Sequence, residues 1–226
     1  MRESVSSLAV KVLSHKKNGK KTVLITGCGA ENGTTMVAIN LSVALSSAGC
    51  RTLLIDADMR SRVKYGSRMA DIGLCDYLSG VSEYDEIVNA SNMDGLYVIP
   101  SGIYGKDPAL LLCSRKTEEL IKKTRDFFDV VVIDCPPAAV VSDASVLFPF
   151  ADGIVLVCAL DKTTKRQLIT AKTIVAPYRD KYYGLVCNGV DLKTYKHLFP
   201  QNNYYRAKSS ARRGIAKRRE TAEEAQ

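Results

Sequence analysis

Short apolar runs alternate along this chain with longer segments whose apolar residues recur at helical spacing. Six such runs predict buried strands, at Val23–Thr26, Thr52–Asp56, Leu96–Ile99, the V-V-V-I-D run that begins at Val130, Gly153–Ala159 and Tyr183–Gly189. Helices are expected at about 4–13, 37–48, 108–127 and 164–177, with a helical turn at 73–80. Strands that alternate with helices in this way predict a mostly parallel sheet with helices on both faces, a three-layer α/β/α fold.

A glycine-rich loop follows the first strand, in the stretch T-V-L-I-T-G-C-G-A-E-N-G-T-T from Thr22 to Thr35. The phosphate-binding pattern G-x-x-x-x-G-K-[ST] uses backbone N–H groups, a lysine and a hydroxyl to hold phosphates and Mg²⁺. Aligned from Gly27 to Thr34, the loop keeps the first glycine and the hydroxyl, but Asn32-Gly33 stands where Gly-Lys is expected. Taken alone, the loop fits a nucleotide site and an ordinary strand-to-helix turn equally well.

Two further strands end in carboxylates. The second strand runs into L-L-I-D-A-D-M-R, which places Asp56, Asp58 and Arg60 at its carboxyl end. The strand V-V-V-I-D-C-P-P delivers Asp134 in the same way. Ligands of parallel α/β sheets bind at the carboxyl ends of the strands, and an aspartate placed there is typical of a Mg²⁺-nucleotide site. These stretches favour the nucleotide site over the plain turn.

Composition and charge indicate the cell compartment and the kinds of partner to expect. The 226 residues suit one domain with a tail, and no apolar run reaches the roughly 18 residues of a membrane span, so we expect a cytoplasmic protein. The seven cysteines are far apart and are predicted to be reduced core residues. The net charge is +8, and the basic residues are concentrated at both ends of the chain. Contact of these ends with a polyanion and a solvated tail both remain open.

In order and separation, these motifs resemble the bacterial tyrosine kinase (BY-kinase) family, the CpsD/CapB-type autokinases of capsule and exopolysaccharide synthesis. That family belongs to the deviant Walker P-loop ATPases. Three further segments of this sequence are similar to segments of the family. They are G-L-C-D-Y-L-S-G from Gly73, I-P-S-G with D-P-A-L-L-L between Ile99 and Leu112, and V-C-N-G-V-D from Val186. The resemblance runs from about residue 3 to 205 and implies a P-loop NTPase-type α/β fold that uses ATP and Mg²⁺.

The resemblance also implies roles for individual residues. The phosphates would be held by Gly27, Cys28, Gly29, Ala30, Glu31, Asn32, Gly33, Thr34 and Thr35. Thr34, Asp56 and Asp134 would hold the metal, and Asp56, Asp58 and Arg60 would serve catalysis. Asn188 would bind the adenine edge, or it is only a strand-end turn. The autophosphorylated tyrosines would be Tyr195, Tyr204 and Tyr205, or these lie in a plain amphipathic loop.

Four departures from the family pattern matter. Gly33 replaces the Walker lysine, Gly29 replaces a proline, and the tail after Tyr205 is basic where the family has more tyrosines. The family's oligomerisation signature E-x-x-R-x-x-R is reduced to Glu3 with Ser6 and Ala9, which leaves a homo-oligomer open. A tyrosine autokinase and a catalytically weak adaptor of the polysaccharide machinery therefore both fit. A partitioning-type ATPase fits less well.

The resemblance further implies partners and a place in the cell. A separate membrane-embedded polysaccharide co-polymerase would recruit the chain to the inner face of the membrane and activate it. The basic tail could add contact with an anionic membrane surface, whereas nucleic acid is not expected. We expect three regions: an N-terminal helix and basic turn at 1–21, the P-loop domain at 22–192, and a tyrosine-containing basic tail at 193–226.

Overall fold

The computed structural model describes residues 2–16, 19, 21–60, 72–102 and 107–191. The chain divides into two units, Met1–Asn188 and Gly189–Gln226, and the fold below is that of the first. The tyrosines predicted to be phosphorylated, Tyr195, Tyr204 and Tyr205, and the basic tail lie outside the described residues.

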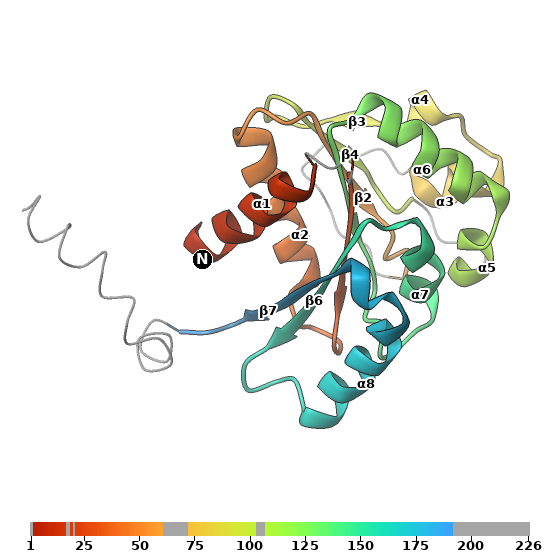
Figure 1. The fold of residues 1–226 in the computed structure, drawn as a ribbon. Helices are drawn as coiled ribbons and strands as arrows, with labels where there is room; N and C mark the ends of the chain where they lie inside the picture. The colour runs from red at the N-terminus through yellow and green to blue at the C-terminus, as the bar shows by residue number, and fades with distance from the viewer. Residues whose placement is uncertain (1, 17–18, 20, 61–71, 103–106, 192–226) are drawn as a thin grey trace, which may run out of the picture. The chain divides into compact units, whose positions relative to one another are not determined.

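A sheet of seven strands forms the middle layer, in the order β3-β4-β2-β5-β1-β6-β7 (Figure 1). The strands are β1 (Thr22–Gly27), β2 (Thr52–Asp56), β3 (Asn89–Ala90), β4 (Leu96–Ile99), β5 (Val130–Asp134), β6 (Gly153–Ala159) and β7 (Tyr182–Asn188). All neighbouring pairs are parallel except β3 with β4. The mostly parallel α/β fold expected from the sequence is confirmed.

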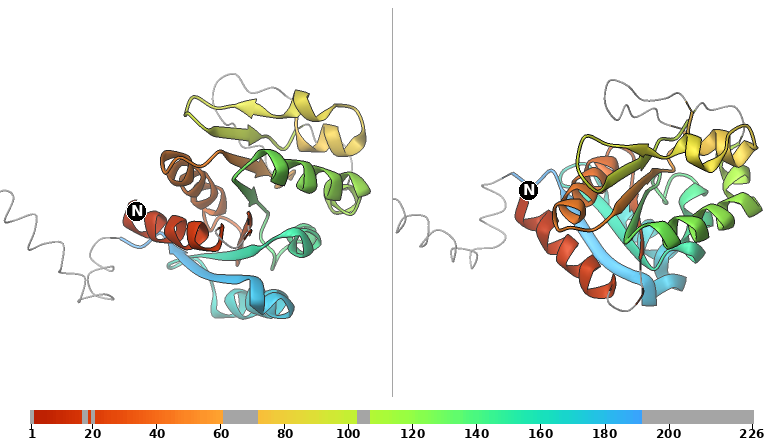
Figure 2. Two further views of the ribbon diagram at one scale, coloured as in Figure 1. Left: turned by 45° about the horizontal axis from the view of Figure 1, so that its top comes forward. Right: turned by 90° about the horizontal axis from the view of Figure 1, so that it is seen from above.

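Helices cover both faces of this sheet (Figures 1 and 2). They are α1 (Arg2–Lys16), α2 (Thr34–Ser47), α3 (Leu74–Ser79), α4 (Tyr84–Ile87), α5 (Pro108–Leu112), α6 (Arg115–Phe127), α7 (Asp143–Leu147) and α8 (Lys165–Val175), with 3₁₀ turns η1 (Phe148–Phe150) and η2 (Ala176–Lys181). Figure 1 shows α1 and α2 on one side of the sheet and α6, α7 and α8 on the other.

Each face of the sheet has its own hydrophobic core, because successive strand residues point to opposite faces. On β2, Leu53 and Ile55 join the core under α3, α6 and α7, whereas Leu54 joins the core under α1 and α2. On β5, Val131 and Val132 divide in the same way. The central strands are therefore apolar at nearly every position, as the unbroken runs in the sequence predict.

Several predicted elements need correction. The helix expected over 108–127 is two helices, because Ser114 adopts an extended conformation (ψ 155°) and starts α6 anew. The short elements β3, α4 and α7 were not predicted. The seven cysteines are free thiols, but Cys113 and Cys187 are exposed, so the expectation that all are core residues is wrong for these two. No helix in the described part of the chain is long and apolar enough to cross a membrane.

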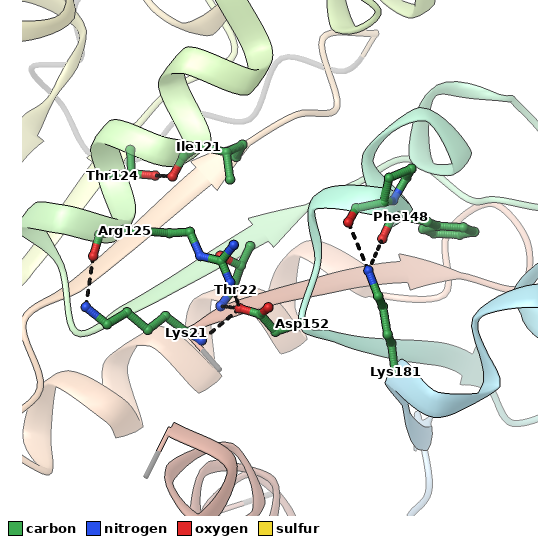
Figure 3. A network of polar contacts seen from close by, with 9 residues as sticks. Lys21, Thr22, Ile121, Thr124, Arg125, Phe148, Asp152 and Lys181 are labelled. Atoms are coloured by element: carbon green, nitrogen blue, oxygen red, sulfur yellow. Dashed lines mark hydrogen bonds and ion pairs between the residues drawn. The ribbon is translucent and has the colours of Figure 1, made fainter. Parts of the chain in front are cut away.

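The start of β1 is fixed by Asp152, which lies just before β6 (Figure 3). Its carboxylate accepts hydrogen bonds from the backbone N–H groups of Lys21 (2.8 Å) and Thr22 (2.9 Å) and pairs with the Arg125 guanidinium. The Lys21 ammonium in turn donates to the Arg125 carbonyl over 2.9 Å. This network ties β1 to α6 and to the entry of β6, and leaves the other end of β1 to the glycine loop.

Candidate functional site

The glycine loop and the two strand-end carboxylates meet at the carboxyl edge of the sheet. β5 lies between β1 and β2, and all three strands run in parallel. In register, Asp134 is opposite Ile25 on one side and opposite Asp56 on the other. Residues that are far apart in the sequence thus lie side by side where β1 passes into its loop.

Asp56 and Asp134 are buried carboxylates with unsatisfied oxygens. Their exposed fractions are 0% and 1%. Burial raises the pKa of Asp56 to about 8, helped by the charge of Asp134, and burial raises the pKa of Asp134 to about 7. Asp56 Oδ2 and both oxygens of Asp134 have no hydrogen-bond partner of ordinary geometry among the described residues. Buried oxygens without a partner are costly, and a bound ion is one of the features that explains them.

Asp58 and Arg60 lie on the loop that leaves β2. The Asp58 N–H donates to Asp56 Oδ1 (3.1 Å), and the Arg60 N–H donates to Asp58 Oδ1 over 3.3 Å. The Arg60 guanidinium forms two bonds with Asp143, from Nε to Oδ2 (2.8 Å) and from Nη2 to Oδ1 (3.0 Å). Arg60, predicted to supply catalytic charge, therefore has its charge engaged by an aspartate that the sequence analysis did not single out.

Gly33 closes the glycine loop and Thr34 opens α2. Gly33 has φ +77° and ψ 31° at the N-cap, a left-handed conformation that favours glycine. The Thr34 hydroxyl turns back into the loop, where it lies 2.9 Å from the point at which a Cβ on Gly27 would stand. The Thr35 hydroxyl approaches Asp134 and acts to lower the pKa of that carboxyl. Thr34 was predicted to be the metal hydroxyl, but Thr35 is the threonine beside the Asp134 carboxylate.

The loop is braced from the β6 and β7 side. Asn188 Nδ2 donates to the Asn32 carbonyl over 3.1 Å, so in this structure the amide predicted to bind adenine faces the loop. Gln167 lies against Gly29. A Cβ atom added to Gly29 would be only 2.6 Å from Gln167 Nε2. Lys162 Nζ lies 3.5 Å from Glu31 Oε2 in an exposed ion pair. Such a pair adds little stability, but it brings a lysine to a loop that has none.

The D-C-P-P segment, which begins at the last residue of β5, is hydrogen-bonded to the end of β1, just before the glycine loop. The Thr26 hydroxyl donates to the Pro136 carbonyl (2.7 Å) and accepts from the Ala138 N–H (3.0 Å). Both bonds are buried, and they fix the peptide that follows Asp134 against the end of β1. The position of Asp134 relative to the glycine loop is therefore set by backbone contacts as well as by strand register.

The donor set suits Mg²⁺ with a nucleotide better than a metal ion alone. No group of three or more His, Cys, Asp or Glu side chains arranged for a metal occurs within the described ranges. Mg²⁺ usually keeps several waters and is bound through one or two carboxylates together with substrate phosphates. The unpartnered oxygens of Asp134 and Asp56, the nearby Thr35 hydroxyl and the N-terminus of α2 fit that kind of site.

Asp143, Lys162 and Gln167 are the site residues that sequence reasoning missed. Asp143 stands in V-S-D-A, eight residues beyond the D-C of D-C-P-P, and Lys162 and Gln167 flank the start of α8. A polar residue at a helix start is usually a cap, so nothing local distinguishes these three residues. Only the strand order, which places the end of β6 next to the end of β1, brings Lys162 and Gln167 to the loop.

Comparison with known proteins agrees with this geometry. The family model described as "AAA domain" matches residues 21–198. The chain is 32% identical over 180 residues to tyrosine-protein kinase CpsD of Streptococcus pneumoniae serotype 4, covering 78% of this chain and 79% of that protein. It is 35% identical over 192 residues to tyrosine-protein kinase YwqD of Bacillus subtilis, covering 84% and 79%. The crystal structure of the chimerical protein CapA2B2 superposes with a TM-score of 0.78 at 25% identity, covering 83% and 84%.

Proposed function

Because this chain belongs to the AAA-domain family of P-loop ATPases and, within it, to the bacterial tyrosine kinases of the CpsD and YwqD type, we propose that it binds Mg-ATP and phosphorylates its own C-terminal tyrosines. The acceptors would be among Tyr195, Tyr204 and Tyr205. The process served would be capsule or exopolysaccharide synthesis. The observation that carries the proposal is the pair of buried carboxylates with unpartnered oxygens beside the glycine loop.

We assign the phosphates to the backbone of Gly27–Gly33 and to the N-terminus of α2, whose first N–H groups have no partner within the helix. The metal would be held by the Thr35 hydroxyl and Asp134, with Asp56 beside them. When bound, Mg²⁺ would neutralise charge on the transferring phosphate. Asp58, half-buried and bonded through its N–H to the Asp56 carboxylate, would accept the proton of an incoming tyrosine hydroxyl.

A second function, a nucleotide-binding adaptor that transfers phosphate poorly, has a specific observation in its favour. The sequence has no lysine between Lys21 and Lys64, so none stands in the loop. Removal of one preorganised charge donor from an active site typically costs about 10²- to 10³-fold in rate. The adaptor would keep the carboxylate site and the fold and lose most of the chemistry.

The deciding experiment measures binding of Mg-ATP and Mg-ADP by calorimetry, with γ-labelled ATP followed into phosphotyrosine in parallel. The autokinase predicts binding with label that disappears in a Tyr195→Phe, Tyr204→Phe, Tyr205→Phe variant. The adaptor predicts binding without label. Asp134→Asn should weaken the Mg²⁺ dependence of binding, whereas Asp94→Asn, on the loop before β4, should not. Absence of nucleotide binding would contradict both functions.

We also propose, from the family, that a membrane-embedded activator of the polysaccharide co-polymerase type recruits the chain to the membrane. The basic residues between Arg206 and Arg219 would add electrostatic attraction to anionic lipid, at about 1 kcal/mol for each one close to the surface. Co-sedimentation with anionic vesicles should weaken when 206–226 is removed, and zwitterionic vesicles should show no such change. Unchanged binding to anionic vesicles after the removal would contradict a role for the tail.

A further inference from the structure

The ion pair between Arg60 and Asp143 joins the loop after β2 to the start of α7. Its two bonds, of 2.8 and 3.0 Å, match the fork of a guanidinium to both oxygens of one carboxylate. The Asp143 side chain is fully buried, whereas the Arg60 side chain is 42% exposed. A buried ion pair seldom stabilises a fold more than an apolar pair of the same size would. Its position beside the carboxylate site calls for another explanation.

Asp143 belongs to the same cluster of negative charge as the metal-site carboxylates. Asp143 pairs with Arg60, whose N–H donates to the Asp58 carboxylate. The Asp58 N–H in turn donates to the Asp56 carboxylate. These contacts connect Asp143 with Asp58 and Asp56 at the carboxyl edge of the sheet. Arg60 lies on the same loop as Asp58, and its own N–H is bonded to the Asp58 carboxylate.

Because the Arg60 backbone is bonded to the Asp58 carboxylate, its guanidinium is a potential competitor for a metal cation at this site. If Asp143 did not hold it, the long arginine side chain could turn toward the unpartnered oxygens of Asp56 and Asp134. A cation that binds there would then have to displace an arginine. Loss of the pair would also release the loop that places Asp58.

We propose that Asp143 is a positioning residue, which holds Arg60 in a two-bond pair and so keeps the Asp56, Asp58 and Asp134 carboxylates open to a divalent cation. The inference rests on the proposed Mg²⁺-nucleotide site. In this structure, Arg60 is paired with Asp143, so we do not assign it to contact with the phosphates. Asp143 acts only through Arg60, so its effect must vanish when Arg60 is absent.

The test is a double-mutant cycle with Asp143→Asn, Arg60→Gln and the two combined, read out as Mn²⁺ affinity by electron paramagnetic resonance in the presence of ADP. We expect Asp143→Asn to weaken Mn²⁺ binding by about tenfold or more, as loss of an outer partner at a metal site commonly does. Arg60→Gln should keep or strengthen binding. The double variant should bind Mn²⁺ within about threefold of the parent chain, because no arginine remains to compete.

The matched control is Asp129→Asn, which breaks the Lys16–Asp129 pair of 2.8 Å before β5, and it should leave Mn²⁺ affinity unchanged. Circular dichroism and urea unfolding verify that each variant is folded. A purely structural role for Asp143 predicts that the double variant binds Mn²⁺ as weakly as Asp143→Asn. That result, or unchanged affinity in Asp143→Asn, overturns the inference alone. A parent chain that binds neither ADP nor Mn²⁺ overturns the proposed function as well.

Discussion

Gly33 and Thr34 differ in whether a lysine can occupy their positions. At Gly33, φ is +77° and an added Cβ would lie 2.1 Å from Asn188 Nδ2. A lysine there would be strained by about 1–2 kcal/mol from its left-handed backbone alone. Thr34 is the first residue of α2, and its side chain already turns back toward Gly27. A lysine at Thr34 would have ordinary helical geometry and would start toward the phosphates.

We therefore predict that Thr34→Lys raises the rate of tyrosine phosphorylation, by up to about 10²-fold if the lysine acts as a preorganised donor. Gly33→Lys should instead lower the unfolding midpoint in urea and give no gain in rate. Both variants add the same charge, so each controls for the other. A gain in rate from Gly33→Lys, with none from Thr34→Lys, would support the alignment that places the lost lysine at Gly33.

At the residue scale, the sequence predicts those site residues that lie at the ends of apolar strands. Asp56 and Asp134 were identified because an acid that ends a buried strand is conspicuous, and strand register then placed them opposite each other. Asp143 and Lys162 were not identified, because their partners Arg60 and Glu31 are 83 and 131 residues away in the chain. Local pattern contains no information about such pairs.

Strand β1 depends on contacts at its first residues as well as on its apolar interior. Asp152 accepts two backbone hydrogen bonds there and pairs with Arg125. We predict that Asp152→Ala lowers the free energy of unfolding by about 2 kcal/mol, because the two N–H donors and the guanidinium lose their acceptor. Urea unfolding measures this change, and Asp180→Ala, at an exposed position of η2, serves as the control. Equal stability of the two variants would show that the network is dispensable.

At the element scale, length determines what the sequence could predict. The bounds expected for β2, β4 and β6 agree with the structure, because each is a nearly unbroken apolar run of four to seven residues. The elements missed have five residues or fewer, namely β3, α4 and α7. Such segments show no more than about one helical turn of periodicity, and tertiary contacts determine them. The division between α5 and α6 was missed because neither glycine nor proline stands between Leu112 and Arg115 to mark the break.

The stability of the whole molecule should depend on pH through its buried carboxylates. The pKa values of Asp56 and Asp134 are raised to about 8 and about 7, against about 4 for aspartate in an unfolded chain. Between those limits the folded state binds more protons than the unfolded state, so the free energy of unfolding falls as pH rises. Without a cation, the melting temperature should therefore fall from pH 5 to pH 8.5, by roughly 2–4 °C for each kcal/mol of stability lost.

Calorimetric melting at several pH values measures this trend, with Asp56→Asn as the comparison. The variant cannot ionise at position 56, so its melting temperature should fall less steeply over the same range. In the proposed site Mg-ADP would bind the ionised carboxylates, so the stabilisation it confers should grow with pH. If the melting temperatures of the two chains fell equally with pH, the pKa of Asp56 would be that of an ordinary aspartate.

The interior place of β1, between β5 and β6 in the sheet, has a consequence for how the protein is made. Thr22 pairs with Val131 of β5, and Val23 pairs with Gly153 of β6, so both neighbours of the first strand are synthesised more than 100 residues after it. Chains elongate at about 5–20 residues per second, so the loop waits several seconds for Asp134 to arrive. Contacts this distant also fold slowly. The nascent protein therefore carries its glycine loop on an apolar strand without these two neighbours, and that strand is vulnerable to aggregation until β5 and β6 emerge from the ribosome.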